Sequence, residues 1–189
     1  ARIAADKWDG IIITHSAFGR LPMKAEAYEE FYKAQMDEIV EAWLAAKAAA
    51  GEADNGKPSR DPTVKQIERK KKAIEAKLDK LMNEDRKDAG VTFEETGVDY
   101  IILDEAHLFK NLDYQSRHSN VKGIGVKGSQ RATDLFMKIQ HLEKARPGRT
   151  ALFATGTPMS RSMAEIYTMQ RYLQLPLLKE YGIDKFDTW

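Results

Sequence analysis

Three short apolar runs, separated by segments with helical periodicity, most constrain the fold of this chain. The runs occupy residues 8–14, 98–103 and 150–155, and each is followed by small or polar residues. A short, continuous apolar run with such a boundary is typical of a strand covered on both faces. Strands that alternate with helices favour a parallel sheet with helical crossovers. We therefore predict an α/β fold.

Two helical segments lie between the first and second runs. Over residues 24–50, apolar side chains recur at spacings of three and four and form one strongly apolar face. Residues 63–87 are rich in Lys and Glu and carry a thin apolar stripe, which is typical of the seam between two helices. We predict that residues 24–96 form a long antiparallel helical hairpin, inserted between the sheet-forming parts 1–23 and 97–189. The aromatic residues that share the apolar face, among them Phe31, Tyr32 and Trp43, are expected in the hairpin core rather than in a base-stacking platform.

Composition excludes several classes of protein. Thirty basic and 29 acidic residues nearly cancel, so any basic surface for nucleic acid must be local. The chain has no cysteine, which excludes disulfides, thiolate zinc sites and a cysteine nucleophile and fits a reducing compartment, so we expect a cytoplasmic protein. No apolar stretch approaches the length of a membrane span, and we expect no membrane contact.

Two adjacent carboxylates, Asp104 and Glu105, follow the second apolar run directly. A parallel sheet places its ligands just beyond the carboxyl ends of its strands. In phosphoryl transfer, such an Asp commonly holds magnesium, while a neighbouring Glu orients the attacking water and accepts its proton. An Asp-Glu pair alone more often only begins a loop, but the longer context, with His107 three residues after Asp104, favours a nucleotide hydrolase.

The third run ends in a second polar segment, Thr155-Gly156-Thr157-Pro158. Its hydroxyls and tight turn, placed beside the carboxylates, are suited to sensing a terminal phosphate. A simple strand-to-helix turn would use the same residue types. We predict a helix from Ser129, its N-cap, to about Ala145, and a last helix over residues 162–173.

These motifs resemble those of superfamily-two helicases of the DEAH-box type, and most closely those of Swi/Snf-type DNA translocases. Residues 167–173 and 186–189 are further similar to the large helicase-like proteins of phages and conjugative elements, which are often joined to adenine-specific DNA methyltransferases. The resemblance covers residues 7–23 and 97–189. It rests on Asp104-Glu105-Ala106-His107 with Lys110-Asn111, on Thr155-Gly156-Thr157-Pro158, and on Glu165-Ile166-Tyr167 with Leu173.

The resemblance implies a partial RecA-like sheet that binds ATP and magnesium and acts on double-stranded DNA. It implies that Asp104 and Glu105 are the magnesium-binding and water-activating pair of helicase motif II, with Asp104 as the metal ligand. His107 would couple that pair to motif III, which is Thr155, Gly156, Thr157 and Pro158. Thr14, His15 and Ser16 resemble motif Ib, which touches the DNA backbone in this family. Lys110 and Asn111 would contact DNA likewise, although Lys110 could equally be a solvated loop charge.

Two parts of the family's pattern are missing. No Gly-Lys-Thr or Gly-Lys-Ser phosphate loop occurs: Gly56-Lys57 precedes Pro58, and Gly148-Arg149-Thr150 has Arg where Lys is required. The second motor domain, which supplies arginine fingers in the family, is absent too. We expect a fragment of the first motor domain, whose parent adds an upstream phosphate-loop segment and a second motor domain. By itself the chain should hydrolyse ATP negligibly.

Two rival functions stay open. One is a degenerate motor fold that binds DNA or protein, with carboxylates that no longer catalyse. The other is a metal-dependent hydrolase using Asp104, Glu105, His107 and His118, which is disfavoured because the histidines lack a helical ligand spacing.

Two basic segments also allow two readings. The second hairpin helix could grip DNA, but interleaved acidic residues favour an ordinary solvated helix. The glycine-bearing residues 123–128 could contact a nucleic-acid backbone or form a surface loop without a role, and they lack the context of a dinucleotide-binding turn. The basic residues concerned are Lys65, Arg69, Lys70, Lys71, Lys72 and Lys77 in the helix, and Lys122, Lys127 and Arg131 around the loop.

Overall fold

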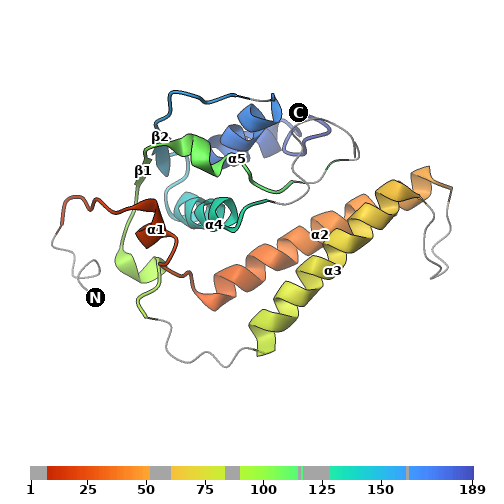
Figure 1. Ribbon diagram of the computed structural model, residues 1–189, viewed down its shortest axis with the longest axis horizontal. Coiled ribbons are helices and arrows are strands. Elements are labelled where there is room, and N and C mark those ends of the chain that lie inside the picture. The colour runs from red at the N-terminus through yellow and green to blue at the C-terminus, as the bar shows by residue number, and fades with distance from the viewer. Residues whose placement is uncertain (1–7, 52–60, 84–89, 115, 117–127, 161) are drawn as a thin grey trace. The chain divides into compact units, whose positions relative to one another are not determined.

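The computed structural model describes residues 8–51, 61–83, 90–114, 116, 128–160 and 162–189, without the side chains of residues 80–83. By its contacts the chain divides into two units, one of residues 1–24, 86–114 and 122–189 and the other of residues 25–85 and 115–121. In the described part of the chain, no helix has both the length and the apolar character to cross a membrane. The elements, with η for a 3-10 helix, are α1 (His15–Phe18), α2 (Ala25–Ala49), α3 (Pro62–Asn83), η2 (Glu94–Thr96), β1 (Ile101–Leu103), η3 (Ala106–Phe109), α4 (Gln130–Ala145), β2 (Ala151–Phe153) and α5 (Ala164–Glu180) (Figure 1).

The first unit contains a two-stranded parallel sheet with flanking helices, in agreement with the predicted α/β class. β1 and β2 pair with Ile101 opposite Ala151 and Leu103 opposite Phe153. Because side chains alternate between the faces of a strand, Ile101 and Leu103 are buried on one face, while Ile102 is exposed on the other. Leu152, the partner of Ile102, is also exposed. The sheet therefore has one packed face and one open apolar face among the described residues.

The predicted first strand is wrong. Residues 8–14 contain no strand, and the side chain of Ile12 at their centre is fully exposed. An apolar run becomes a strand only where a neighbour takes up its backbone hydrogen bonds, and in the described residues β1 pairs with β2 alone. The run instead leads into α1, because the Thr14 hydroxyl accepts the Ala17 N–H at 3.2 Å and caps that helix.

Helix α4 was predicted closely. Ser129 is its N-cap, with its hydroxyl accepting the Ala132 N–H at 3.2 Å, and the helix ends at Ala145. Its apolar side chains form the core of the first unit, where Leu135 and Ile139 are completely buried.

Helix α5 runs further than predicted and changes direction. The backbone of Gln174 has non-helical φ and ψ angles of −150° and 35°, two residues before Pro176. Proline has no N–H for the preceding turn and clashes with it, which explains why the helix breaks there. Before the kink, the Tyr172 hydroxyl shares its one proton between the carbonyls of Phe109 and Ala132, which lie at 3.1 and 2.9 Å. The side chain of Tyr172 thereby ties α5 to both η3 and α4.

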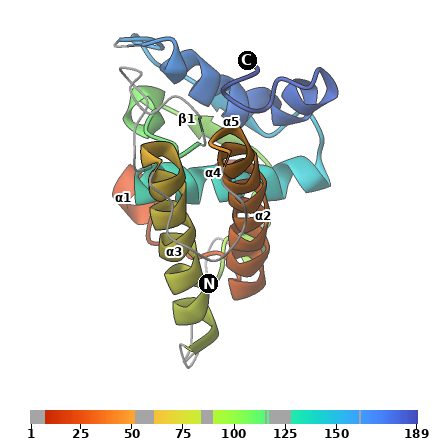
Figure 2. The same ribbon diagram turned by 90° about the vertical axis from the view of Figure 1, so that its right-hand side faces the viewer.

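The second unit consists of α2 and α3 packed side by side (Figure 2). Ile39, Ile67 and Ile74 form its buried centre. Trp43, late in α2, donates its indole N–H to Glu68, early in α3, at 3.2 Å. Trp43 therefore packs between the two helices, as expected for a hairpin core residue rather than a base-stacking platform. Further along the seam, the Lys77 ammonium lies 5.2 Å from the ring centroid of Tyr32.

Several residues of interest lie outside the described residues. They are Gly56, Lys57, His118, Lys122, Lys127 and the glycine-bearing residues 123–127.

Candidate functional site

The two carboxylates of the site follow β1 and are both exposed. Asp104 Oδ1 accepts the Glu105 N–H at 2.9 Å. The other carboxylate oxygen, Oδ2, takes no part in that hydrogen bond. Glu105 has φ and ψ angles of 52° and 44°, and no other non-glycine residue in the described ranges has a positive φ. A left-handed conformation costs about 1–2 kcal/mol for such a residue. The turn at Glu105 sends the chain from β1 into η3 and keeps both carboxylates at the end of the strand.

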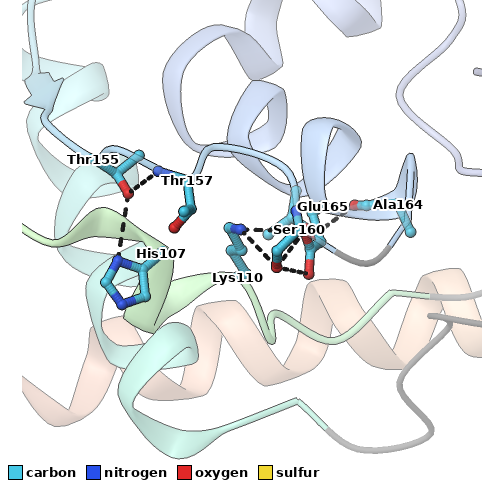
Figure 3. Close-up of polar contacts among 8 residues, drawn as sticks. His107, Lys110, Thr155, Thr157, Ser160, Ala164 and Glu165 are labelled. Carbon is cyan, nitrogen blue, oxygen red and sulfur yellow. Dashed lines mark hydrogen bonds and ion pairs between the residues drawn. The ribbon is translucent and has the colours of Figure 1, made fainter.

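His107 connects Glu105 to the end of the neighbouring strand, where Figure 3 shows its contact with Thr155. Its Nδ1 lies 3.1 Å from Glu105 Oε2 and 3.4 Å from Thr155 Oγ1. Thr155 Oγ1 also accepts the Thr157 N–H at 3.2 Å, so the Thr155 hydroxyl can donate its proton to His107. A protonated Nδ1 donates to Glu105, whereas an unprotonated Nδ1 accepts from Thr155. His107 can therefore favour one neighbour or the other according to which ring nitrogen carries the hydrogen.

Backbone hydrogen bonds hold these side chains at their positions. The Ala106 N–H donates to the Ala154 carbonyl at 3.0 Å, and the Ala154 N–H donates to the Leu103 carbonyl at 2.8 Å. These bonds continue the pairing of β1 and β2 beyond the sheet. They fix the relative register of Glu105, His107 and Thr155, which the sequence had placed at the same edge.

The polar segment after β2 leaves the sheet as a short strap, which we define as residues 155–160. Gly156, Thr157 and Pro158 are exposed on the strap, and none of their side chains has a described bond to the carboxylates. The far end of the strap is held by Glu165, whose Oε2 accepts the Ser160 N–H at 2.5 Å.

Lys110, which the sequence assigned to DNA contact or to a solvated loop, lies against that far end. Its ammonium is 3.1 Å from Glu165 Oε2 and 3.3 Å from Ser160 Oγ. Its side chain is only 10% exposed, which excludes the solvated loop charge. Asn111 is exposed, and its carbonyl accepts the Ser129 N–H at 2.7 Å. Contact of either residue with DNA stays a prediction.

The three residues that resemble motif Ib lie at the beginning of α1. Thr14 and Ser16 are exposed. The His15 ring meets the Phe109 ring edge-on, with 5.2 Å between centroids, and so packs α1 against η3. The structure thus connects His15 to the turn that follows the carboxylates, while DNA contact by all three residues stays a prediction.

Sequence reasoning missed a buried ion pair that anchors α1. Lys138 of α4 is completely buried, with its ammonium 2.7 Å from Asp134 Oδ2 and 2.9 Å from the Phe18 carbonyl. The same ammonium is 4.1 Å from the centroid of the Phe18 ring. Burial lowers the pKa of Lys138 and raises the pKa of Asp134, and their mutual attraction opposes both shifts. The only sequence signal was an Asp and a Lys four residues apart inside an apolar stripe.

The site's donors fit magnesium better than zinc. The described residues contain no group of three or more His, Cys, Asp or Glu side chains that could hold a metal ion by themselves. Magnesium in nucleotide sites keeps several waters and uses one or two carboxylates together with substrate phosphates, which the exposed Asp104 carboxylate suits. A hydrolytic zinc site needs three protein ligands, and His118 lies outside the described residues.

Comparison with protein-family models matches residues 1–189 to a family described as "Probable helicase domain". No curated protein matches the chain. No solved structure matches it either.

Proposed function

Because this chain belongs to the family described as "Probable helicase domain", we propose that it is the part of an ATP-dependent DNA translocase that carries motifs II and III. The observation that supports this most is the chain of contacts from Glu105 through His107 to Thr155. It joins a carboxylate at the end of one strand to a hydroxyl at the end of its parallel neighbour. A motor needs such a connection, because the state of the nucleotide must reach the segments that move.

The residues would divide the chemistry as follows. Magnesium, when bound with ATP, would neutralise charge that develops on the phosphates, and Asp104 would hold it. Glu105 would orient the attacking water and accept its proton. A neutral Glu105 attracts the Nδ1–H of His107 less than a carboxylate does, so this N–H would turn toward the Thr155 oxygen, whose remaining lone pair can accept it. The strap would thereby register that hydrolysis has taken place.

The finer assignments are part of the same proposal and follow from the resemblance to DEAH-box, Swi/Snf-type translocases. Double-stranded DNA would be the partner, contacted by Thr14, His15, Ser16 and Asn111. The parent protein would supply a phosphate loop and a second motor domain. It would be a cytoplasmic protein similar to the helicase-like proteins of phages and conjugative elements, a group often joined to DNA methyltransferases. The helices α2 and α3 would form a hairpin insertion in a RecA-like core.

ATP turnover of the parent protein, measured with and without double-stranded DNA, tests the proposal. We expect hydrolysis that DNA stimulates, and a loss of at least about a hundredfold in kcat for Glu105→Gln, since general-base catalysis contributes that much or more. Glu180→Gln, which removes an exposed carboxylate at the end of α5, is the matched control and should leave the rate unchanged.

The results of these measurements distinguish the proposed translocase from a degenerate motor fold. Unchanged turnover in Glu105→Gln would refute the assignment of the catalytic base. DNA binding without any hydrolysis in the parent protein would instead favour the degenerate motor fold, which binds DNA or protein without catalysing.

A further inference from the structure

The strap, residues 155–160, is attached to η3 and the residue that follows it at both of its ends (Figure 3). At its beginning, Thr155 Oγ1 meets His107 Nδ1 at 3.4 Å. At its end, Ser160 Oγ meets the Lys110 ammonium at 3.3 Å, and Glu165 Oε2 meets the same ammonium at 3.1 Å. The residues between, 156–159, are exposed. The strap is therefore a short segment that is attached at two points, Thr155 and Ser160.

Both attachment points contact the same turn of the chain, η3 with its C-cap residue. Lys110 is the C-cap of η3, and its N–H contacts the His107 carbonyl at 3.5 Å. A displacement of this turn must carry His107 and Lys110 together, because they are three residues apart in one helical turn. The strap should then follow the turn as one body.

The second attachment point, at Ser160, is better shielded from solvent than an ordinary surface ion pair. The side chains of Lys110 and Glu165 are only 10% and 14% exposed. Glu165 Oε2 accepts from the Ser160 N–H as well as from Lys110, and Ser160 Oγ lies 3.2 Å from both Glu165 oxygens. A charge-assisted network of this kind holds its members more firmly than isolated exposed pairs do.

We propose that Lys110 is a positioning residue, whose clasp on Glu165 and Ser160 keeps the strap on the η3 turn and Thr155 within reach of His107. This role rests on the proposed function for its effect on activity, but not for its effect on the structure. It differs from a DNA contact, because an ammonium that Glu165 neutralises and shields has little charge left to offer a phosphate.

Amide hydrogen exchange tests the clasp without any activity. In Lys110→Met, we expect the amides of Thr157 and Ser160 to exchange about fivefold faster, as the loss of an ion pair worth about 1 kcal/mol predicts. Amides of the α4 core should keep their rates. Lys179→Met, which removes an exposed lysine of α5, is the matched control and should change neither amide.

Exchanging the two charges distinguishes a clasp from a simple loss of packing. Glu165→Lys with Lys110→Glu should return the Thr157 amide, which donates to Thr155 Oγ1, to within about twofold of its original rate, whereas each single variant should not. The Ser160 amide should stay fast in the exchanged pair, because a lysine at position 165 cannot accept its N–H. Unchanged exchange in Lys110→Met, or no recovery of the Thr157 amide in the exchanged pair, would overturn the proposal. Lys110→Arg keeps the charge and serves where Lys110→Met fails to fold: its two amides should stay protected, and fast exchange there would count against the clasp.

Activity of the parent protein then separates positioning from DNA contact. A positioning role predicts that Lys110→Met lowers the DNA-stimulated kcat about tenfold or more while the Kd for DNA and its salt dependence stay the same. A DNA contact predicts a weaker Kd and a salt slope reduced by about 1, which would overturn the positioning role. If the unaltered parent shows no hydrolysis, the proposed function fails, and the exchange experiment still decides whether the clasp exists.

Discussion

Replacing Lys138 with methionine should destabilise the protein by about 3 kcal/mol, because it removes a completely buried cation from its ion pair with Asp134. The Lys138 ammonium contacts the Asp134 carboxylate at 2.7 Å, the Phe18 carbonyl at 2.9 Å, and the centroids of the Phe18 and Phe93 rings at 4.1 and 5.7 Å. Loss of one member of a buried pair costs about 3–5 kcal/mol, since the other charge is left without compensation. The Asp134 side chain is still 14% exposed to solvent, so the lower end of that range applies.

A second variant identifies the source of the loss. When Asp134→Leu is added to Lys138→Met, the pair leaves no uncompensated charge, and the bond to the Phe18 carbonyl and the contacts with the Phe18 and Phe93 rings are missing. The double variant should therefore lose about 1 kcal/mol, which is the usual net value of one hydrogen bond. Urea unfolding followed by circular dichroism measures both free energies of unfolding.

The pH dependence supplies an independent check on Asp134. In the folded protein, burial raises the pKa of Asp134 above its ordinary value, and the loss of Lys138 should raise that pKa further. A folded state that binds the proton more readily than the unfolded chain gains stability as the pH falls from neutral through the raised pKa. The deficit of Lys138→Met should therefore shrink in acid. A double variant as unstable as the single one, or a deficit that does not change with pH, would refute the role assigned to the uncompensated carboxylate.

Two further substitutions test local geometry. Gly128→Ala would place a Cβ atom 2.5 Å from the Asp113 nitrogen, so we expect a loss of about 1–3 kcal/mol in the free energy of unfolding, whereas Gly156→Ala meets open space and should cost far less. At Glu105, whose φ is 52°, glycine relieves the left-handed strain that alanine retains, so Glu105→Gly should be about 1 kcal/mol more stable than Glu105→Ala in thermal unfolding. Equal stabilities of the two Glu105 variants would show that the turn carries no strain.

The sequence predicted those parts of the fold that depend on local pattern. Ser129 could be recognised as a helix cap because an N-cap acts on the amides of the next few residues. The strands that became β1 and β2 could be recognised because both are short apolar runs that end in polar residues. Residues 8–14 have the same pattern without being a strand, since a pattern does not reveal whether a neighbour will accept its hydrogen bonds.

In the candidate site, too, features set by local pattern could be predicted, whereas contacts between distant residues could not. The run from Asp104 to His107 and the segment from Thr155 were placed at one edge of the sheet from sequence, and the structure brings Glu105, His107 and Thr155 into contact. The ion pair of Lys110 with Glu165 could not be foreseen, because its members lie 55 positions apart and no spacing rule relates them. A charged residue in a loop looks the same in sequence whether its partner is water or a buried carboxylate.

The pairing of β1 with β2 also bears on the order in which the protein folds. Ile101 and Ala151 are partners although fifty positions separate them, and closing a loop of that length costs entropy before any contact repays it. Helix α4, which lies within the loop, needs only local contacts to begin. We expect the helix to form first and to shorten the search for the sheet. The edge that carries Glu105 and Thr155 would then be among the last parts of the molecule to assemble.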